Sequence, residues 1–285
     1  MNYLADYLSP QWMAFIIDQL SLWLMVFSVD TVRYLLGAGL VSLVLFIGLS
    51  RWSNSRRIQT RRASAQDIRR EITHSLITTA VYASVALFTI AAEQQGALRV
   101  YASLDDYSAI YTLLSLPLLL ILHDTYFYWV HRAMHQRSLF RWVHRTHHLS
   151  RTPTPWAAYS FAPLEALAMA VFMPLALALI PLHELVIFLF LMIMIVRNAV
   201  GHSGVEVFHH QWVDTPLDVM TTVTHHDMHH QHFNGNYGLY FTWWDRWMGT
   251  ELPRYRDEFR RVVSSSKGAQ TQQAFAANTQ RAEEG

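Results

Sequence analysis

The sequence predicts an all-α, polytopic membrane protein with about four to six membrane helices. Of its 285 residues, 52% are hydrophobic and 15% are charged, whereas globular proteins carry about 25% charged residues. Apolar runs long enough to cross a bilayer, which takes about 20 residues, recur through the first 200 positions. The formal net charge of +1 gives no reason to expect nucleic acid as a partner.

The apolar runs can be placed one by one. The first contains Asp18, so it either spans the membrane or lies in the interface. The last is long enough for two spans, with a break near Pro181. In chain order, the candidate spans are residues 11–29, 34–50, 74–92, 109–130 and a pair within 161–200.

The arginines set the expected orientation. Residues 51–70 contain seven arginines and residues 132–151 contain five. Cytoplasmic loops are enriched in Lys and Arg, so both segments are expected on the cytoplasmic side. Counting spans from there also places everything after Gly201 on that side.

Histidine is the most unevenly distributed residue. Fifteen of the 16 histidines lie between His123 and His232, and cysteine is absent. The lack of cysteine excludes disulfides, thiolate-bound zinc and thiol catalysis. The clustered histidines instead point to a metal site made of imidazoles.

The spacing of the histidines favours two metals. Residues three or four apart share a helical face, and an adjacent pair such as His147–His148 extends the reach to a second ion. One metal accepts roughly four to six ligands, so nine imidazoles imply two metals. The predicted ligands are His131, His135, His144, His147, His148, His202, His226, His229 and His230.

Four more residues are possible members of the site. His123 lies eight residues before His131, on nearly the same helical face, and His225 adjoins the last cluster; each is a possible ligand. Asp124 and Asp227 are candidates to accept a hydrogen bond from a ligand ring and so orient it. Isolated histidines are more often ordinary polar groups, an interpretation that covers His74, His183, His209, His210 and His232.

These motifs resemble the sterol desaturase and fatty acid hydroxylase superfamily. The resemblance extends from about Leu116 to Thr250 and is closest to the C4-methyl sterol oxidase and C5-sterol desaturase branch. The matching segments are Asp124-x-x-x-Tyr128-Trp-x-His131-Arg-x-x-His135, His144-x-x-His147-His148, Gly201-His202-Ser-Gly204, His226-x-x-His229-His230, Asn234-Gly-Asn-Tyr-Gly238 and Phe241-Thr-Trp-Trp-Asp-Arg-x-x-Gly-Thr250.

The resemblance implies a cytosolic helical cap that carries a histidine-ligated di-iron site. It also implies O2 as co-substrate and an external electron donor, either cytochrome b5-like or a ferredoxin with its reductase. Residues 1–72 are then N-terminal membrane helices with a basic cytosolic loop, and 73–263 form the catalytic domain. Residues 264–285 are expected to be a disordered tail.

The expected activity is hydroxylation or desaturation of an unactivated C–H bond in a membrane lipid. A sterol or other polycyclic lipid, or a fatty acyl chain, is the expected substrate. The catalytic residues are expected to be the predicted metal ligands other than His202. The alternatives are a di-zinc membrane hydrolase and a non-enzymatic metal- or haem-binding membrane protein. Catalytic zinc normally keeps about three protein ligands, and nine histidines exceed that number.

Overall fold

The computed structural model describes residues 10–264. Helices dominate this part of the chain, and its only strands are the two-residue β1 (Val100–Tyr101) and β2 (Leu182–His183). Four helices are long and apolar enough to cross a membrane. The all-α, polytopic fold is therefore confirmed. The tail predicted to be disordered lies, apart from Ser264, outside the described residues.

The first two predicted spans form one helix. α1 (Pro10–Leu43) continues through a π-helical turn, η1 (Val44–Gly48), and is followed by α2 (Ser50–Ser55). The polar residues between the predicted spans do not interrupt it, because Asp30 and Arg33 pair across one turn at 2.9 Å. The expectation of separate spans at 11–29 and 34–50 was therefore wrong.

Three more long helices complete the set of candidate spans. These are α3 (Ala65–Gln94), α4 (Ala109–Met134) and α9 (Glu184–Gly201). At the start of α3, the Ser64 side chain accepts a hydrogen bond from the Asp67 backbone amide, and the Asp67 side chain accepts one from the Ser64 backbone amide. This capping box satisfies two amide groups at the helix start. Two-thirds or more of the most apolar window of each span is not buried inside the protein, as expected for helices that face lipid.

The predicted pair of spans in 161–200 is only half realised. Its first half forms two short helices, α7 (Pro163–Ala170) and α8 (Phe172–Leu179), and its second half forms α9. Pro174 lacks the amide hydrogen that would bond to the carbonyl of Ala170, and the break lies between α7 and α8 at Val171.

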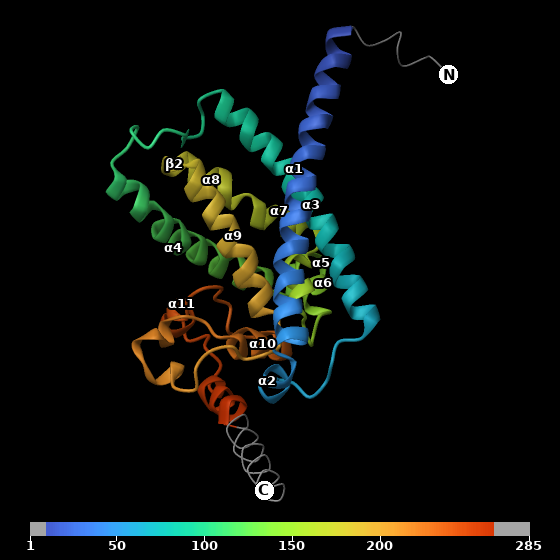
Figure 1. Cartoon of the computed structure of the whole chain (residues 1–285), viewed down its shortest axis with the longest axis vertical. Coiled ribbons are helices and arrows are strands. Elements are labelled where there is room, and N and C mark those ends of the chain that lie inside the picture. The colour runs from blue at the N-terminus through green and yellow to red at the C-terminus, as the bar shows by residue number, and fades with distance from the viewer. Residues whose placement is uncertain (1–9, 265–285) are drawn as a thin grey trace, which may run out of the picture.

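The remaining elements gather at one end of the long helices. Figure 1 shows α1 descending from the N-terminal side to α2, with α10 and α11 at the same lower end. The elements of this end are α5 (Arg137–Val143), α6 (Arg145–His148), η2 (Pro155–Tyr159), η3 (Trp212–Asp214), η4 (Pro216–Val219), α10 (Val223–His232) and α11 (Trp243–Trp247). At the other end, β1 pairs in parallel with β2 and joins the α3–α4 connection to the start of α9.

Close packing of α1 against α9 fixes the first helix in the bundle. A Cβ atom added at Gly37 would lie 2.7 Å from Cγ1 of Ile195, so the absence of a side chain permits this approach. Tyr34, two residues of η2 and Ile195 belong to one buried cluster. A second cluster joins α4, α8 and α9. The long helices thus surround the apolar space described below.

Candidate metal centre

Nine imidazole rings from four parts of the chain meet at the lower end of the bundle. They come from the end of α4, from the α5–α6 segment, from the residue after α9 and from α10. In each of two groups, the potential ligand atoms all lie within 4.8 Å of one another. The first group is His131, His135, His144, His148 and His229; the second is His147, His202, His226 and His230.

The partition follows helical spacing of four, not three. His144 and His148 fall in the same group, whereas His147 belongs to the other. In α10, His226 and His230 are likewise together and His229 is separate. Adjacent histidines therefore serve different groups, so α6 and α10 each contribute to both.

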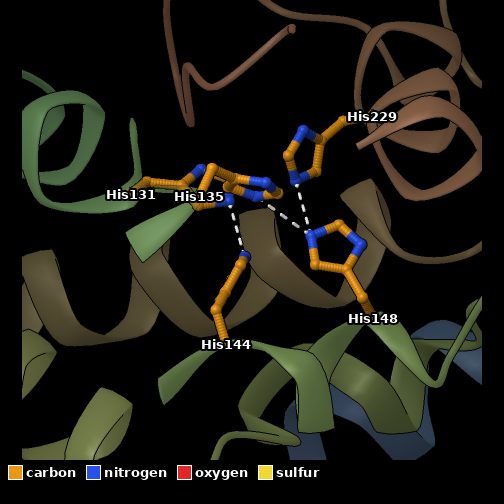
Figure 2. Close-up of side chains that lie close together, drawn as sticks. All are labelled: His131, His135, His144, His148 and His229. Atoms are coloured by element: carbon orange, nitrogen blue, oxygen red, sulfur yellow. Dashed lines mark hydrogen bonds between the residues drawn. The ribbon is translucent and has the colours of Figure 1, made fainter. Parts of the chain in front are cut away.

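The spacing of the ring nitrogens fits a shared metal ion. Nε2 of His131 lies 3.0 Å from Nε2 of His144, and Nε2 of His202 lies 3.3 Å from Nε2 of His147. Two nitrogens bound to one ion at about 2.1 Å lie roughly 3.0–3.4 Å apart for bond angles between about 90° and 109°. Figure 2 shows the five rings of the first group turned toward one another. The residues present therefore fit a pair of imidazole-bound metals.

Hydrogen bonds at Nδ1 hold several rings in the orientation that metal binding needs. An Nδ1–H that donates to an oxygen leaves the Nε2 lone pair directed at the centre of the group. Four rings contact backbone carbonyls in this way: His131 with Tyr237 (2.9 Å), His147 with Ser160 (3.4 Å), His202 with Asn198 (2.8 Å) and His229 with Gly235 (2.7 Å).

A carboxylate that the sequence analysis missed holds a fifth ring. Oε1 of Glu165, in α7, lies 2.6 Å from Nδ1 of His144, and both side chains are buried. A carboxylate partner orients an imidazole and raises its basicity as a ligand. Glu165 is the only charged residue in 161–180, and a lone acid in an apolar stretch is a signal that could have identified it.

Burial keeps the histidines neutral. It lowers the pKa of His202 to about 4, and burial followed by the charge of His131 lowers the pKa of His135 to about 2. The pKa values of the group members on α6 and α10 also fall well below the usual 6.5, again mainly through burial. Neutral imidazole is the form that binds metal.

The turn after α10 fixes two of the carbonyl groups that contact the rings. Within residues 234–238, Asn236 has a φ of 58°, a left-handed conformation that Asn tolerates and that is typical of a turn. The Asp245 carboxylate accepts hydrogen bonds from the backbone amides of Tyr237 at 2.9 Å and Gly238 at 2.8 Å. The aromatic segment around α11 thus supports the centre from outside.

The two aspartates expected to orient ligands lie elsewhere. Oδ1 of Asp124 accepts from the three backbone amides of residues 239–241. Oδ1 of Asp227 accepts from Gln59 at 3.0 Å and from Gln231 at 2.6 Å. Both carboxylates therefore brace the polypeptide around the centre, and no described contact joins them to a ring of either group.

The other uncertain histidines also lie outside both groups. Nδ1 of His123 is 3.0 Å from the hydroxyl of Tyr240, and Nε2 of His225 is 3.6 Å from Oδ2 of Asp245. Neither is brought together with the nine rings. The same holds for the histidines expected to be ordinary polar groups: His74, His183, His209, His210 and His232.

An apolar cavity of about 460 Å³ leads toward the centre. Its lining on α9 runs from Glu184 to Asn198, which corresponds to about 21 Å at 1.5 Å per residue. At the inner end, Phe161 packs against the ring of His147 with centroids 5.2 Å apart. The carbonyl of Asn198 contacts His202 at 2.8 Å. The cavity therefore ends about one side chain away from the second group of rings.

Comparison with known proteins supports the assignment suggested by the motifs. Residues 116–250 match the fatty acid hydroxylase family. The chain is 31% identical over 184 residues to Delta(7)-sterol 5(6)-desaturase ERG3B of Gibberella zeae, covering 64% of this chain and 55% of that protein. It is 30% identical over 165 residues to lathosterol oxidase of Rattus norvegicus, covering 57% and 53%.

A third relative is methylsterol monooxygenase 1 of Rattus norvegicus, 28% identical over 152 residues, with 52% of this chain and 50% of that protein covered. The matched region thus spans about half the length of these relatives. No solved structure matches the chain. The histidine pattern, the matched domain and these relatives together make residues 116–250 similar to the fatty acid hydroxylase family and to the sterol desaturases and sterol oxidases that share its histidine motifs.

Proposed function

We propose that this chain is an O2-dependent di-iron oxidoreductase that hydroxylates or desaturates an unactivated C–H bond of a membrane lipid. The substrate is a sterol or other polycyclic lipid, or a fatty acyl chain. The observation that carries the proposal is the convergence of nine neutral imidazoles, in groups of five and four, at the inner end of an apolar cavity. The names of the three relatives, a sterol desaturase, a lathosterol oxidase and a methylsterol monooxygenase, favour a sterol.

The metal ions and the protein side chains would have different roles in the reaction. Two ions held by the nine histidines would supply O2 activation and hydrogen abstraction, which side chains cannot carry out by acid–base chemistry. The chain itself would bind the ions through Nε2, holds five of the rings through Nδ1, and keeps water away by burying eight of the nine rings. The cavity holds the substrate with one end beside Phe161.

The ligand count favours iron oxidation chemistry over the hydrolytic alternative. Catalytic zinc keeps about three protein ligands and an open position, whereas the two groups here offer five and four imidazoles. The alternative of a metal transporter fits less well, because transporters hold ions near the bilayer midplane. Here the rings lie at or beyond the ends of α4 and α9.

We further propose that the metal end faces the cytoplasm and receives electrons from a separate protein. The arginine-rich segments lie at this end, as the positive-inside rule requires for a cytoplasmic face. A groove of about 540 Å³ here is lined by Arg57, Arg61, Arg62 and Arg261, and its only acid is Glu258. The excess of positive charge in this groove is complementary to an acidic electron carrier, such as a cytochrome b5-like protein or a ferredoxin.

Metal and lipid analysis of the same cells tests the proposal. The full chain, purified from membranes, is expected to contain two irons, and lipids from the expressing cells should include a species changed by one oxygen atom or by two hydrogens. Cells that express His147→Ala serve as the matched control and should lack that species. An iron-loaded chain that changes no lipid, or a chain active with zinc alone, would contradict the proposal.

A further inference from the structure

Two opposite charges lie in the wall of the apolar cavity, within the first membrane helix. Asp30 and Arg33 form an ion pair at 2.9 Å, with side chains 13% and 10% exposed, and both line the cavity. Charged residues inside a membrane helix are costly and rare, and they usually mark a functional position. They lie outside the matched domain, residues 116–250, so the histidine site alone does not account for them.

A third polar group completes this part of the wall. Tyr159 lines the cavity, and its hydroxyl lies close enough to the Arg33 guanidinium to interact with it electrostatically. Arg33 and Tyr159 also share a side-chain hydrogen bond, whereas no close hydrogen-bond partner reaches Nε of Arg33 among the described residues. A buried donor without a partner is expensive, and a polar group of a ligand in the cavity would satisfy it.

Asp30, Arg33 and Tyr159 lie toward the histidine end of the cavity, and this position determines which end of a bound ligand faces the histidines. Tyr159 is followed by Ser160, whose carbonyl contacts His147 at 3.4 Å, so the polar groups belong to the inner part of the cavity. Tyr82 of α3 packs on Tyr159 with centroids 5.3 Å apart. From Tyr82 the α3 lining continues outward to Glu93, about 16 Å further along the helix. Most of that lining is apolar.

We propose that Asp30, Arg33 and Tyr159 bind the hydroxyl group of a lipid alcohol, and so orient the substrate with its hydroxyl-bearing end toward the histidines. The substrate oxygen accepts a hydrogen bond from Nε of Arg33, while its hydrogen is donated to the Asp30 carboxylate or the Tyr159 hydroxyl. The apolar body extends outward along α3 and α9. Carbons near the hydroxyl therefore face the metals, which deepens the proposed function and rests on it.

A binding experiment without turnover tests the anchor by itself. The full holoprotein in lipid nanodiscs, under anaerobic conditions and without an electron donor, is titrated with lathosterol and with its 3-deoxy counterpart. A hydrogen bond to a charged group should make the wild type prefer the alcohol by about tenfold or more. A purely structural role of the three residues would leave no such preference.

Two variants connect the preference to these side chains. Tyr159→Phe removes one hydroxyl, and the double variant Asp30→Asn/Arg33→Met removes both charges without leaving either one unpaired. In both variants, the ratio of the affinity for lathosterol to the affinity for the deoxy sterol is expected to fall toward one. The affinity for the deoxy sterol itself should stay within about twofold of wild type. Equal binding of the two sterols by the wild type, binding of neither, or full preference in both variants would overturn the proposal.

The outcome is separable from that of the proposed function. Iron content and lipid oxidation are measured on the same preparations. A chain that discriminates between the sterols but oxidises no lipid would refute the oxygenase and keep the anchor. A chain that oxidises lipid without discriminating would refute the anchor and keep the oxygenase.

Discussion

Oε1 of Glu165 lies 2.6 Å from Nδ1 of His144, and the two side chains are 0% and 1% exposed. This contact joins α7, which is not one of the long spans, to the metal centre. It is the one contact of a carboxylate with a ring of either group among residues 10–264.

Replacing Glu165 should weaken metal binding. Glu165→Leu removes the acceptor at Nδ1, so we expect a 10- to 100-fold loss of metal affinity or activity. Glu165→Gln keeps an oxygen acceptor and should retain much more of both. Metal analysis after dialysis against a mild chelator measures the difference. Full metal retention by Glu165→Leu would show that the contact does not support the site.

Removing a ring from the second group should abolish activity. His147→Ala deletes an Nε2 that lies 3.3 Å from Nε2 of His202, so both the metal content and lipid oxidation should fall. His209→Ala is the matched control, because His209 is exposed and outside both groups. If His147→Ala kept full activity, the assignment of this histidine as a ligand would be wrong.

Acid should release the metals and destabilise the protein. The unfolded chain has histidine pKa values near 6.5, whereas burial lowers the pKa of His202 to about 4 and burial with the charge of His131 lowers that of His135 to about 2. A lowered folded-state pKa gives a contribution to stability that is complete above pH 6.5 and declines as the pH falls from there toward about 4.

Metal content and unfolding temperature measured between pH 8 and pH 5 check this expectation. Both quantities should be flat at the alkaline end and fall below about pH 6.5, because protons compete with metal for the same nitrogens. A metal content that rose as the pH fell would contradict the neutral, buried state of the rings.

Asp124 should matter for stability more than for chemistry. Its carboxylate accepts three backbone amides of residues 239–241 and Nε1 of Trp243. Asp124→Leu leaves these buried donors without an acceptor, at a cost of about 1–3 kcal/mol for each unsatisfied group. We expect a clear loss of thermal stability in nanodiscs, with a smaller loss for Asp124→Asn. An unchanged unfolding temperature in both variants would refute this role.

Charge reversal in the basic groove should slow electron delivery. Arg61→Glu/Arg62→Glu is expected to lower turnover with a protein donor and to reduce the dependence of the rate on salt. Turnover with a small chemical reductant should stay near wild type, because the groove is distinct from the nine rings. Equal loss with both reductants would point to damage of the centre instead of lost docking.

The membrane fold and the clustering of the histidines could be predicted from the sequence because both depend on local patterns of residues. Helical spacing singled out most of the nine histidines whose rings converge, although spacing of three did not predict how they divide into two groups, and the lack of charge predicted the membrane fold. The remaining features depend on contacts between distant segments. Glu165 and His144 are 21 residues apart, and no periodicity links them. From the sequence, Asp30 and Arg33 were interpreted as part of a gap between two spans. In the structure the two side chains form an ion pair, and α1 continues through them.

The alternation of adjacent histidines between groups has a consequence for assembly. His147 and His148 belong to different groups, and so do His229 and His230. In the proposed two-metal centre, an ion bound by one group would hold the short helices that also carry ligands for the other group, and this would favour binding of the second ion. Loading of the two groups should therefore be cooperative, and a half-filled protein should be a minor species during maturation.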